Sequence, residues 1–164
     1  MKFVAITLAV SLLAMAAVAQ DQAMATKPSA DKMINVPGLP KCITGQPMRG
    51  DPGKGAFVIY AKASAGCDIP MHWHTAGEEL SWISGSGHLK MKDEADQTMT
   101  AGMFAHFPAK HPHALKCTTA CTFYVNSDGA FDIHYVDASG NEIPTDQALS
   151  MGKMEKKSGM MKKK

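Results

Sequence analysis

The most informative part of the chain is the stretch Gly66-Cys67-Asp68-Ile69-Pro70-Met71-His72-Trp73-His74-Thr75-Ala76-Gly77-Glu78. In a β-strand, residues two positions apart project to the same face, so His72 and His74 point together. The three residues that follow can turn the chain and return Glu78 at the head of the next strand. The stretch therefore predicts two strands that carry two imidazoles and a carboxylate toward one point.

Two adjacent carboxylates, Glu78 and Glu79, compete for this inward position. Leu80 and Trp82 share their parity with Glu78, so an inward apolar side takes Glu78 with it. Glu79 is then expected to meet solvent. The sequence favours Glu78.

A third imidazole is predicted from the second histidine-rich stretch, Gly102-Met103-Phe104-Ala105-His106-Phe107-Pro108-Ala109-Lys110-His111-Pro112-His113. Its last residue, His113, begins an apolar strand. Three nitrogens and one oxygen suit Mn, Fe, Zn, Ni or Cu, so the ligand type alone does not select the ion. We predict one divalent metal ion, Fe, Mn or Zn, held by His72, His74, Glu78 and His113, with coordination positions left open for water or a small ligand. The alternative is a metal-free barrel with hydrogen-bonded core histidines.

The other histidines and the large aromatic residues near these stretches have simpler interpretations. We expect His111 to be a surface or entry residue rather than a fifth ligand. His106 either orients a metal ligand or is an ordinary strand residue, and the two readings stay open. His88 and His134 are expected to be ordinary strand residues whose hydrogen bonds are satisfied. Trp73 is expected to pack outside the barrel. Trp82 and Phe104 are expected either to line the pocket or to fill the core.

The region between the two ends of the chain reads as β-structure throughout. Short β-branched or aromatic runs are separated by turn signals such as Gly85-Ser86-Gly87 and Asp128-Gly129. The predicted strands are Ala56–Lys62, Asp68–His74, Glu79–Ser84, His88–Met91, Met103–Phe107, Ala114–Cys117, Thr122–Asn126 and Phe131–Val136. Many short strands at close spacing predict an all-β sandwich or barrel.

The two ends of the chain differ from this middle. Lys2, an apolar run and Ala17-Val18-Ala19 predict a signal peptide at residues 1–19, although a retained anchor is the alternative. Residues 20–40 read as a flexible lead-in, 41–145 as the single β-domain, and 146–164 as a disordered tail rich in Lys and Met, with a terminal turn at Thr145–Met151 as the alternative for its start. The methionines of the tail could also be soft copper ligands, a reading that composition disfavours.

Charge is distributed unevenly along the chain. The net charge is +2, but residues 152–164 carry +5 and Lys2 carries +1, which leaves −4 for residues 20–151. A mildly acidic domain lacks the basic face that tracks phosphates, so nucleic acid is not expected as a partner. No later segment is apolar enough to span a membrane, so no membrane association is expected once the leader is removed. A secreted or periplasmic location is predicted.

All four cysteines lie after the predicted leader. An even number in an exported chain predicts disulfides, with three connectivities allowed. Cys117 and Cys121 flank a short connection between strand-like runs, so the pairing Cys117–Cys121 with Cys42–Cys67 is preferred. A soft metal site built from the thiolates is the alternative.

Both histidine-rich stretches resemble the two sequence motifs of the cupin superfamily. The first motif is matched at every step by Gly66, His72, His74, Glu78 and Gly85. The second is matched by Gly102, Pro108 and His113, but Lys110 stands where the family usually has glycine, and Cys117 where it often has asparagine. Lys110 puts the geometry of that turn in question. The resemblance covers roughly residues 40–138 and is strongest to small exported bacterial cupins. It implies a jelly-roll barrel of roughly six to eight strands with the ion inside, and often a homodimer.

Neither the ligand set nor the resemblance names a reaction, because cupins host many functions. One hypothesis is a metal-dependent oxidoreductase, dioxygenase-like, or an isomerase whose small substrate chelates the open positions. The second is a non-catalytic binding protein for a metal or a small ligand, and a third uses the barrel only as a scaffold for dimerisation. Apart from the four ligands the sequence shows no acid–base pair, since Glu79 and His106 are merely near these ligands in sequence.

Overall fold

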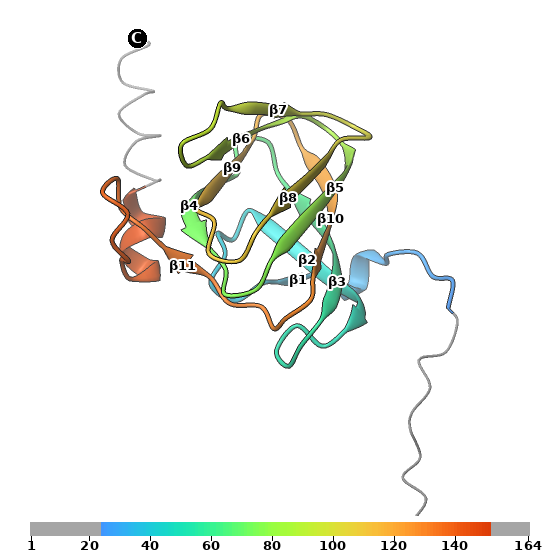
Figure 1. Ribbon diagram of the computed structural model, residues 1–164. Helices are drawn as coiled ribbons and strands as arrows, with labels where there is room; N and C mark the ends of the chain where they lie inside the picture. Colours follow the sequence, from blue (N-terminus) through green and yellow to red (C-terminus); the bar gives the residue numbers. More distant parts are fainter. Residues whose placement is uncertain (1–23, 152–164) are drawn as a thin grey trace, which may run out of the picture.

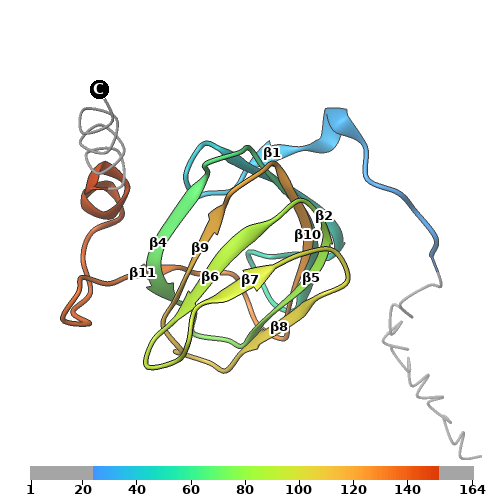
Figure 2. The ribbon, with the colours of Figure 1, turned by 90° about the horizontal axis from the view of Figure 1, so that it is seen from above.

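The fold consists of two antiparallel β-sheets that face each other and enclose the core (Figures 1 and 2). The computed structural model describes residues 24–151. Within this range one sheet has the strand order β1-β2-β3-β10-β5-β8 and the other the order β11-β4-β9-β6-β7. The all-β jelly-roll barrel that the sequence predicts is confirmed. The strands are β1 (Ile34–Asn35), β2 (Ile43–Gly50), β3 (Phe57–Ala63), β4 (Asp68–Trp73), β5 (Glu78–Ser84), β6 (Gly87–Met91), β7 (Gln97–Met99), β8 (Phe104–Phe107), β9 (His113–Cys117), β10 (Cys121–Ser127) and β11 (His134–Tyr135).

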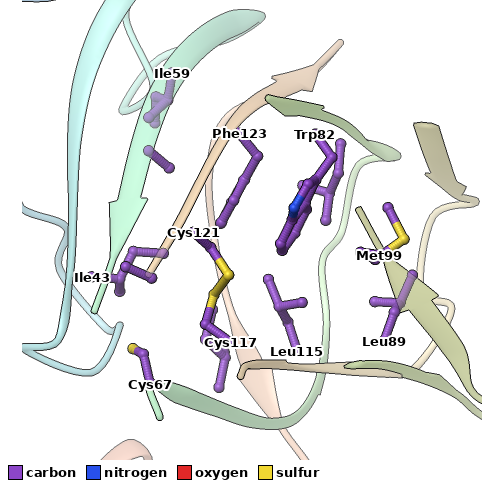
Figure 3. Close-up of a cluster of buried hydrophobic side chains, with 14 of the residues drawn as sticks. Ile43, Ile59, Cys67, Trp82, Leu89, Met99, Leu115, Cys117, Cys121 and Phe123 are labelled. Carbon is purple, nitrogen blue, oxygen red and sulfur yellow. A yellow bond between two sulfur atoms is a disulfide. The ribbon is translucent and has the colours of Figure 1, made fainter. Parts of the chain in front are cut away.

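The core forms because alternate side chains of the strands face the space between the sheets. In β3 the residues Phe57, Ile59 and Ala61 are buried, while the residues between them are half-buried. Trp82 of β5 stacks on Phe123 of β10 with ring centroids 4.9 Å apart, and Figure 3 shows the two among the buried side chains. This packing excludes water from one end of the barrel interior.

The predicted strands correspond to observed ones with shifts of at most one residue at each end, with one exception. The exception is the run Phe131–Val136, of which only His134–Tyr135 pairs as β11. The Phe131 amide donates instead to the Pro52 carbonyl oxygen, 2.7 Å away. This amide is therefore not part of the hydrogen bonding between neighbouring strands.

The strand β2 is missing from the sequence prediction. Gly45, Pro47 and Gly50 read as breakers, yet β2 pairs with β3 along its whole length. The pairing register shifts between Pro47 and Arg49, which accommodates the proline at a bulge. Gly45 lies so close to β3 that an added Cβ would stand 2.9 Å from Ile59 Cγ2. The strands β1 and β7 were also not predicted, because they are only two and three residues long.

Both predicted tails contain structure near the barrel. Residues 30–35, inside the predicted lead-in, form a 3-10 turn (Ala30–Lys32) and then β1. Residues 145–151 are helical and lie on the β4 side of the barrel (Figures 1 and 2), in agreement with a terminal turn there rather than with a disordered tail from residue 146. Ala148 is the reason, because its side chain is buried in the core cluster. The predicted signal peptide at 1–19 and the tail beyond residue 151 lie outside the described residues.

Two disulfides join the cysteines in the preferred pairing. Cys42 and Cys67 have Cα atoms 5.5 Å apart and link the start of β2 to the start of β4. Cys117 and Cys121 have Cα atoms 5.9 Å apart and link the end of β9 to the start of β10 (Figure 3). The alternative thiolate metal site is therefore wrong.

Candidate metal centre

The four predicted ligands come together inside the barrel. His72 belongs to β4 and pairs in register with His113, the first residue of β9. His74 follows the end of β4, and Glu78 is the first residue of β5. One nitrogen or oxygen atom from each residue lies within 4.8 Å of all the others. The three histidines are buried, with exposed fractions of 3%, 8% and 2% for His72, His74 and His113.

Each of the three imidazoles is oriented by a backbone carbonyl. His72 Nδ1 lies 2.7 Å from the Pro70 oxygen, and His113 Nδ1 lies 3.0 Å from the His111 oxygen. His74 Nδ1 bonds to the Asp132 oxygen. A carbonyl oxygen only accepts hydrogen bonds, so each Nδ1 carries the donated proton. In the neutral ring this leaves the Nε2 lone pair free, and such a hydrogen bond is the usual support of a metal-ligating histidine.

The carboxylate completes the group from the opposite sheet. Glu78 Oε2 lies 3.0 Å from His113 Nε2, and Oε1 lies 3.6 Å from His74 Nε2. Burial acts to raise the pKa of Glu78, but the contact with His113 and the positive charge that His74 and His113 carry when protonated together lower it. Glu78 therefore stays ionised. Burial, and then the positive charge that His113 and His74 carry when protonated, hold the pKa of His72 well below its usual range, so His72 stays neutral.

The arrangement satisfies the requirements of a cation site. The Nε2 atom of His74 is buried and has no hydrogen-bond partner, because the Glu78 oxygen at 3.6 Å is too far away for a hydrogen bond. An unpaired buried nitrogen beside a buried carboxylate is costly unless a cation joins them. Three imidazole nitrogens and one carboxylate oxygen are the donors that divalent transition metals prefer. The residues present therefore fit a divalent metal ion.

The two neighbouring carboxylates have the orientations predicted from strand parity. The side chain of Glu78 is 13% exposed and that of Glu79 is 47% exposed. Glu79 Oε1 lies 3.8 Å from His106 Nδ1, and His106 is 56% exposed on the outer face of β8. His106 is therefore an outward strand residue and does not orient a ligand.

His111 lies apart from the four residues, as expected for a non-ligand. Its Nε2 atom is 3.7 Å from Glu94 Oε1, and its backbone oxygen supports His113. The turn that contains it keeps a left-handed residue, since Lys110 has φ = 62°. The Lys110 amide donates to the His74 carbonyl oxygen at 2.8 Å. The turn geometry is thus retained without the family's usual glycine.

The aromatic residues around the site divide into three groups. Trp73 packs outside the barrel as predicted, stacked on His134 of β11 at 3.9 Å between ring centroids. Trp82 fills the core, and its Nε1 donates to the Gly85 oxygen at 3.0 Å. Phe104 is 57% exposed and neither lines a pocket nor fills the core, so both readings offered for it were wrong. Its strand β8 presents that side to solvent. His88 lies in β6 as an ordinary strand residue.

A small cavity adjoins the four residues inside the barrel. It has a volume of about 40 Å³, and its lining apart from these residues is apolar. A second space of about 10 Å³ also touches His74 and Glu78. Phe57 and Phe131 border both.

Two contributors to the site were missed by the sequence analysis, Asp132 and Phe131. The Asp132 backbone oxygen holds His74, and its Oδ1 accepts from the Thr75 amide at 2.8 Å. No pattern of residue types predicts that a backbone oxygen 58 residues away in the sequence will accept a hydrogen bond from His74. Phe131 was assigned to a strand rather than to the cavity.

The family comparison agrees with the motif spacing. A family model described as cupin domain matches residues 60–126, a range that contains all four residues of the group. No curated protein is significantly similar to the chain.

Several solved structures share the fold. The DMSP lyase DddQ from Ruegeria pomeroyi DSS-3 is 16% identical, with a TM-score of 0.55 over 70% of this chain and 62% of that one. An RmlC-like cupin from Shewanella frigidimarina NCIMB 400 is 15% identical, with a TM-score of 0.54 over 64% of this chain and 91% of that one. A structure from work on the DMSP lyases RdDddP and RnDddQII is 22% identical, with a TM-score of 0.52 over 58% of this chain. The match spans about half, 53%, of that last protein. At these identities the likeness concerns the fold alone.

Proposed function

We propose that this chain, in which a cupin-domain model matches residues 60–126, is a mononuclear metal-binding cupin whose ion is held by His72, His74, Glu78 and His113. The observation that supports this most is the common orientation of the three imidazoles. Each donates its Nδ1 proton to a backbone carbonyl, so the Nε2 atoms converge on the buried Glu78 carboxylate. The unpaired Nε2 of His74 then gains a partner.

The chain's own residues have separable roles in this proposal. The carbonyls of Pro70, His111 and Asp132 fix the direction of the three rings. Glu78 supplies a negative charge that offsets part of the charge of a divalent ion. Fe, Mn or Zn would supply Lewis acidity, and Fe or Mn also redox chemistry.

The first functional candidate is a metal-dependent oxidoreductase, dioxygenase-like, or an isomerase that acts on a small chelating substrate. Four protein ligands leave positions open on a five- or six-coordinate ion. The cavity beside the group offers space for a molecule in those positions. A substrate bound there would be oriented by the ion and by the apolar wall.

The alternative is a binding protein for a metal or a small ligand, without turnover. It is favoured by one observation about the cavity. Among the described residues that line it, His72, His74, Glu78 and His113 are the only ones with a titratable side chain. A proton-transfer step would therefore lack a base that is not already engaged with the ion.

We further propose that the mature protein is secreted or periplasmic. The two disulfides fit an oxidising compartment. Within residues 24–151, the helical segments are too short or too polar to span a lipid bilayer. The homodimer implied by the family resemblance stays a prediction.

Metal analysis of the mature protein, purified from its native compartment, tests the proposal. We expect about one equivalent of a divalent ion in the wild type and loss of it in the variant His72→Ala/His74→Ala. The variant His88→Ala/His106→Ala, which removes two histidines outside the group, should retain the ion. Fe or Mn would favour redox or isomerase chemistry, and Zn would favour hydrolytic or isomerase chemistry or a structural role. A wild type that takes up no metal after reconstitution overturns the proposal.

A turnover assay separates the two candidates. An enzyme should lose activity on a chelating substrate when His113→Ala removes one ligand. A carrier should load its ligand reversibly and leave every tested chelating compound unchanged.

A further inference from the structure

The cavity beside the metal group is small and offers no polar anchor of its own. Its volume is about 40 Å³, whereas an engineered apolar cavity that binds benzene measures about 150 Å³. Apart from the four proposed ligands, its walls are apolar side chains, among them Ile59, Leu80, Phe123 and Phe131. Among the described lining residues there is no lysine or arginine. A charged group placed against this wall would lie buried without a partner, which is costly.

Phe131 lies at the boundary of this cavity. It lines both the space of about 40 Å³ and the adjoining space of about 10 Å³. Its ring centroid is 5.6 Å from that of His74 and 6.3 Å from that of Phe57, where the two phenyl rings meet edge to face. The side chain is half-buried and packs against the core cluster. Phe131 therefore forms part of the wall of both spaces beside the metal group.

The backbone on both sides of this ring is anchored. The Phe131 amide donates to the Pro52 oxygen at 2.7 Å. The next residue, Asp132, accepts from His74 Nδ1 through its backbone oxygen and from the Thr75 amide through its side chain. The loop cannot swing away without breaking the bond that orients His74. With its backbone held in this way, the Phe131 side chain is one of the groups that limit the space for a ligand.

We propose that Phe131 is the specificity-determining residue of the site and that its ring restricts the ligand to a molecule of a few non-hydrogen atoms. This rests on the proposed function, because such a ligand is held by the ion through its donor atoms. The rest of the molecule faces apolar walls, so the class is small anions or neutral molecules with one coordinating end. Aromatic chelators are excluded while the ring is in place.

The first experiment does not depend on the metal and tests whether the Phe131 ring blocks the binding of an aromatic molecule in the cavity. Benzene binding is measured by calorimetry on the protein as purified, for the wild type, Phe131→Ala and Phe104→Ala. Phe104 is exposed on β8 and serves as the matched control. We expect Phe131→Ala to bind benzene at least about tenfold more tightly than the other two proteins. Equal affinities for all three overturn the proposal.

The second experiment uses Co²⁺-loaded protein, whose visible spectrum reports binding at the ion. Azide and acetate should perturb the spectrum of the wild type, and benzoate should bind at least about tenfold more weakly than acetate. Phe131→Ala should remove this difference, and Phe104→Ala should retain it. Thermal melting checks the fold, and Phe131→Leu, which should show a partial effect, replaces the alanine variant if that variant unfolds.

The outcomes separate the two proposals. Bound metal with no discrimination between acetate and benzoate, or no response to any of the three anions, overturns the role of Phe131 and leaves the metal site standing. If the protein takes up no metal and, of the three proteins, only Phe131→Ala binds benzene, the metal site is overturned and the role of Phe131 in restricting the cavity is supported.

Discussion

The two disulfides should stabilise the barrel unequally, because they close loops of different length. A cross-link stabilises by restricting the unfolded chain, with an entropy of about −2.1 − 1.5R ln n cal/mol/K for n residues. The separation of 25 residues for Cys42–Cys67 gives about 3.5 kcal/mol at 25 °C. The separation of 4 for Cys117–Cys121 gives about 2 kcal/mol. The difference of about 1.5 kcal/mol comes from loop length alone.

Chemical denaturation of two paired alanine variants measures this difference. Cys42→Ala/Cys67→Ala and Cys117→Ala/Cys121→Ala are unfolded in urea beside the oxidised wild type, and the free energies of unfolding are compared. Both cysteine pairs lie in or against the core, so the stability lost by removing buried sulfur atoms is similar in the two variants and largely cancels in the comparison. An equal loss in the two variants, or a greater loss from the shorter loop, would refute the unfolded-state explanation.

Three further substitutions test local geometry, each by the free energy of unfolding in urea. Gly85→Ala should cost about 3 kcal/mol or more, since φ is +76° and the new Cβ would lie 1.9 Å from the Ala120 oxygen; a near-neutral result would contradict this turn. Lys110→Gly should be about 0.5–1 kcal/mol more stable than Lys110→Ala, because φ is 62°, and the reverse order would exclude the left-handed conformation. Tyr135→Phe should cost about 1–2 kcal/mol, because the hydroxyl of the buried Tyr135 donates to the Gly38 oxygen at 2.8 Å; an unchanged stability would show that water replaces the bond.

Local pattern explains most of what could be predicted about the strands. Alternation selected Glu78 over Glu79, since Leu80 and Trp82 share the parity of Glu78 and are buried. The pattern failed for β2, where Pro47 sits at a bulge and Gly45 approaches Ile59 closely. Both residues weaken a strand taken alone and are tolerated because β3 pairs beside them.

The spacing of the histidine motif predicted which side chains would meet, but not what supports them. His72, His74 and Glu78 lie within seven residues, so two strands and one turn suffice to bring them together. The support of His74 comes from the Asp132 carbonyl, on a loop that no pairing rule assigns. The same loop carries Phe131 to the cavity.

The sequence by itself thus determined the all-β class, the preferred cysteine pairing and the four residues that converge. These follow from side-chain parity, turn residues and motif spacing, all of which act over short stretches of chain. Only the tertiary structure decided which Nδ1 atoms are held by carbonyls, how small the cavity is, and that Phe131 lines it. Those properties depend on backbone atoms and packed volumes brought together from distant segments, and residue type does not encode them locally.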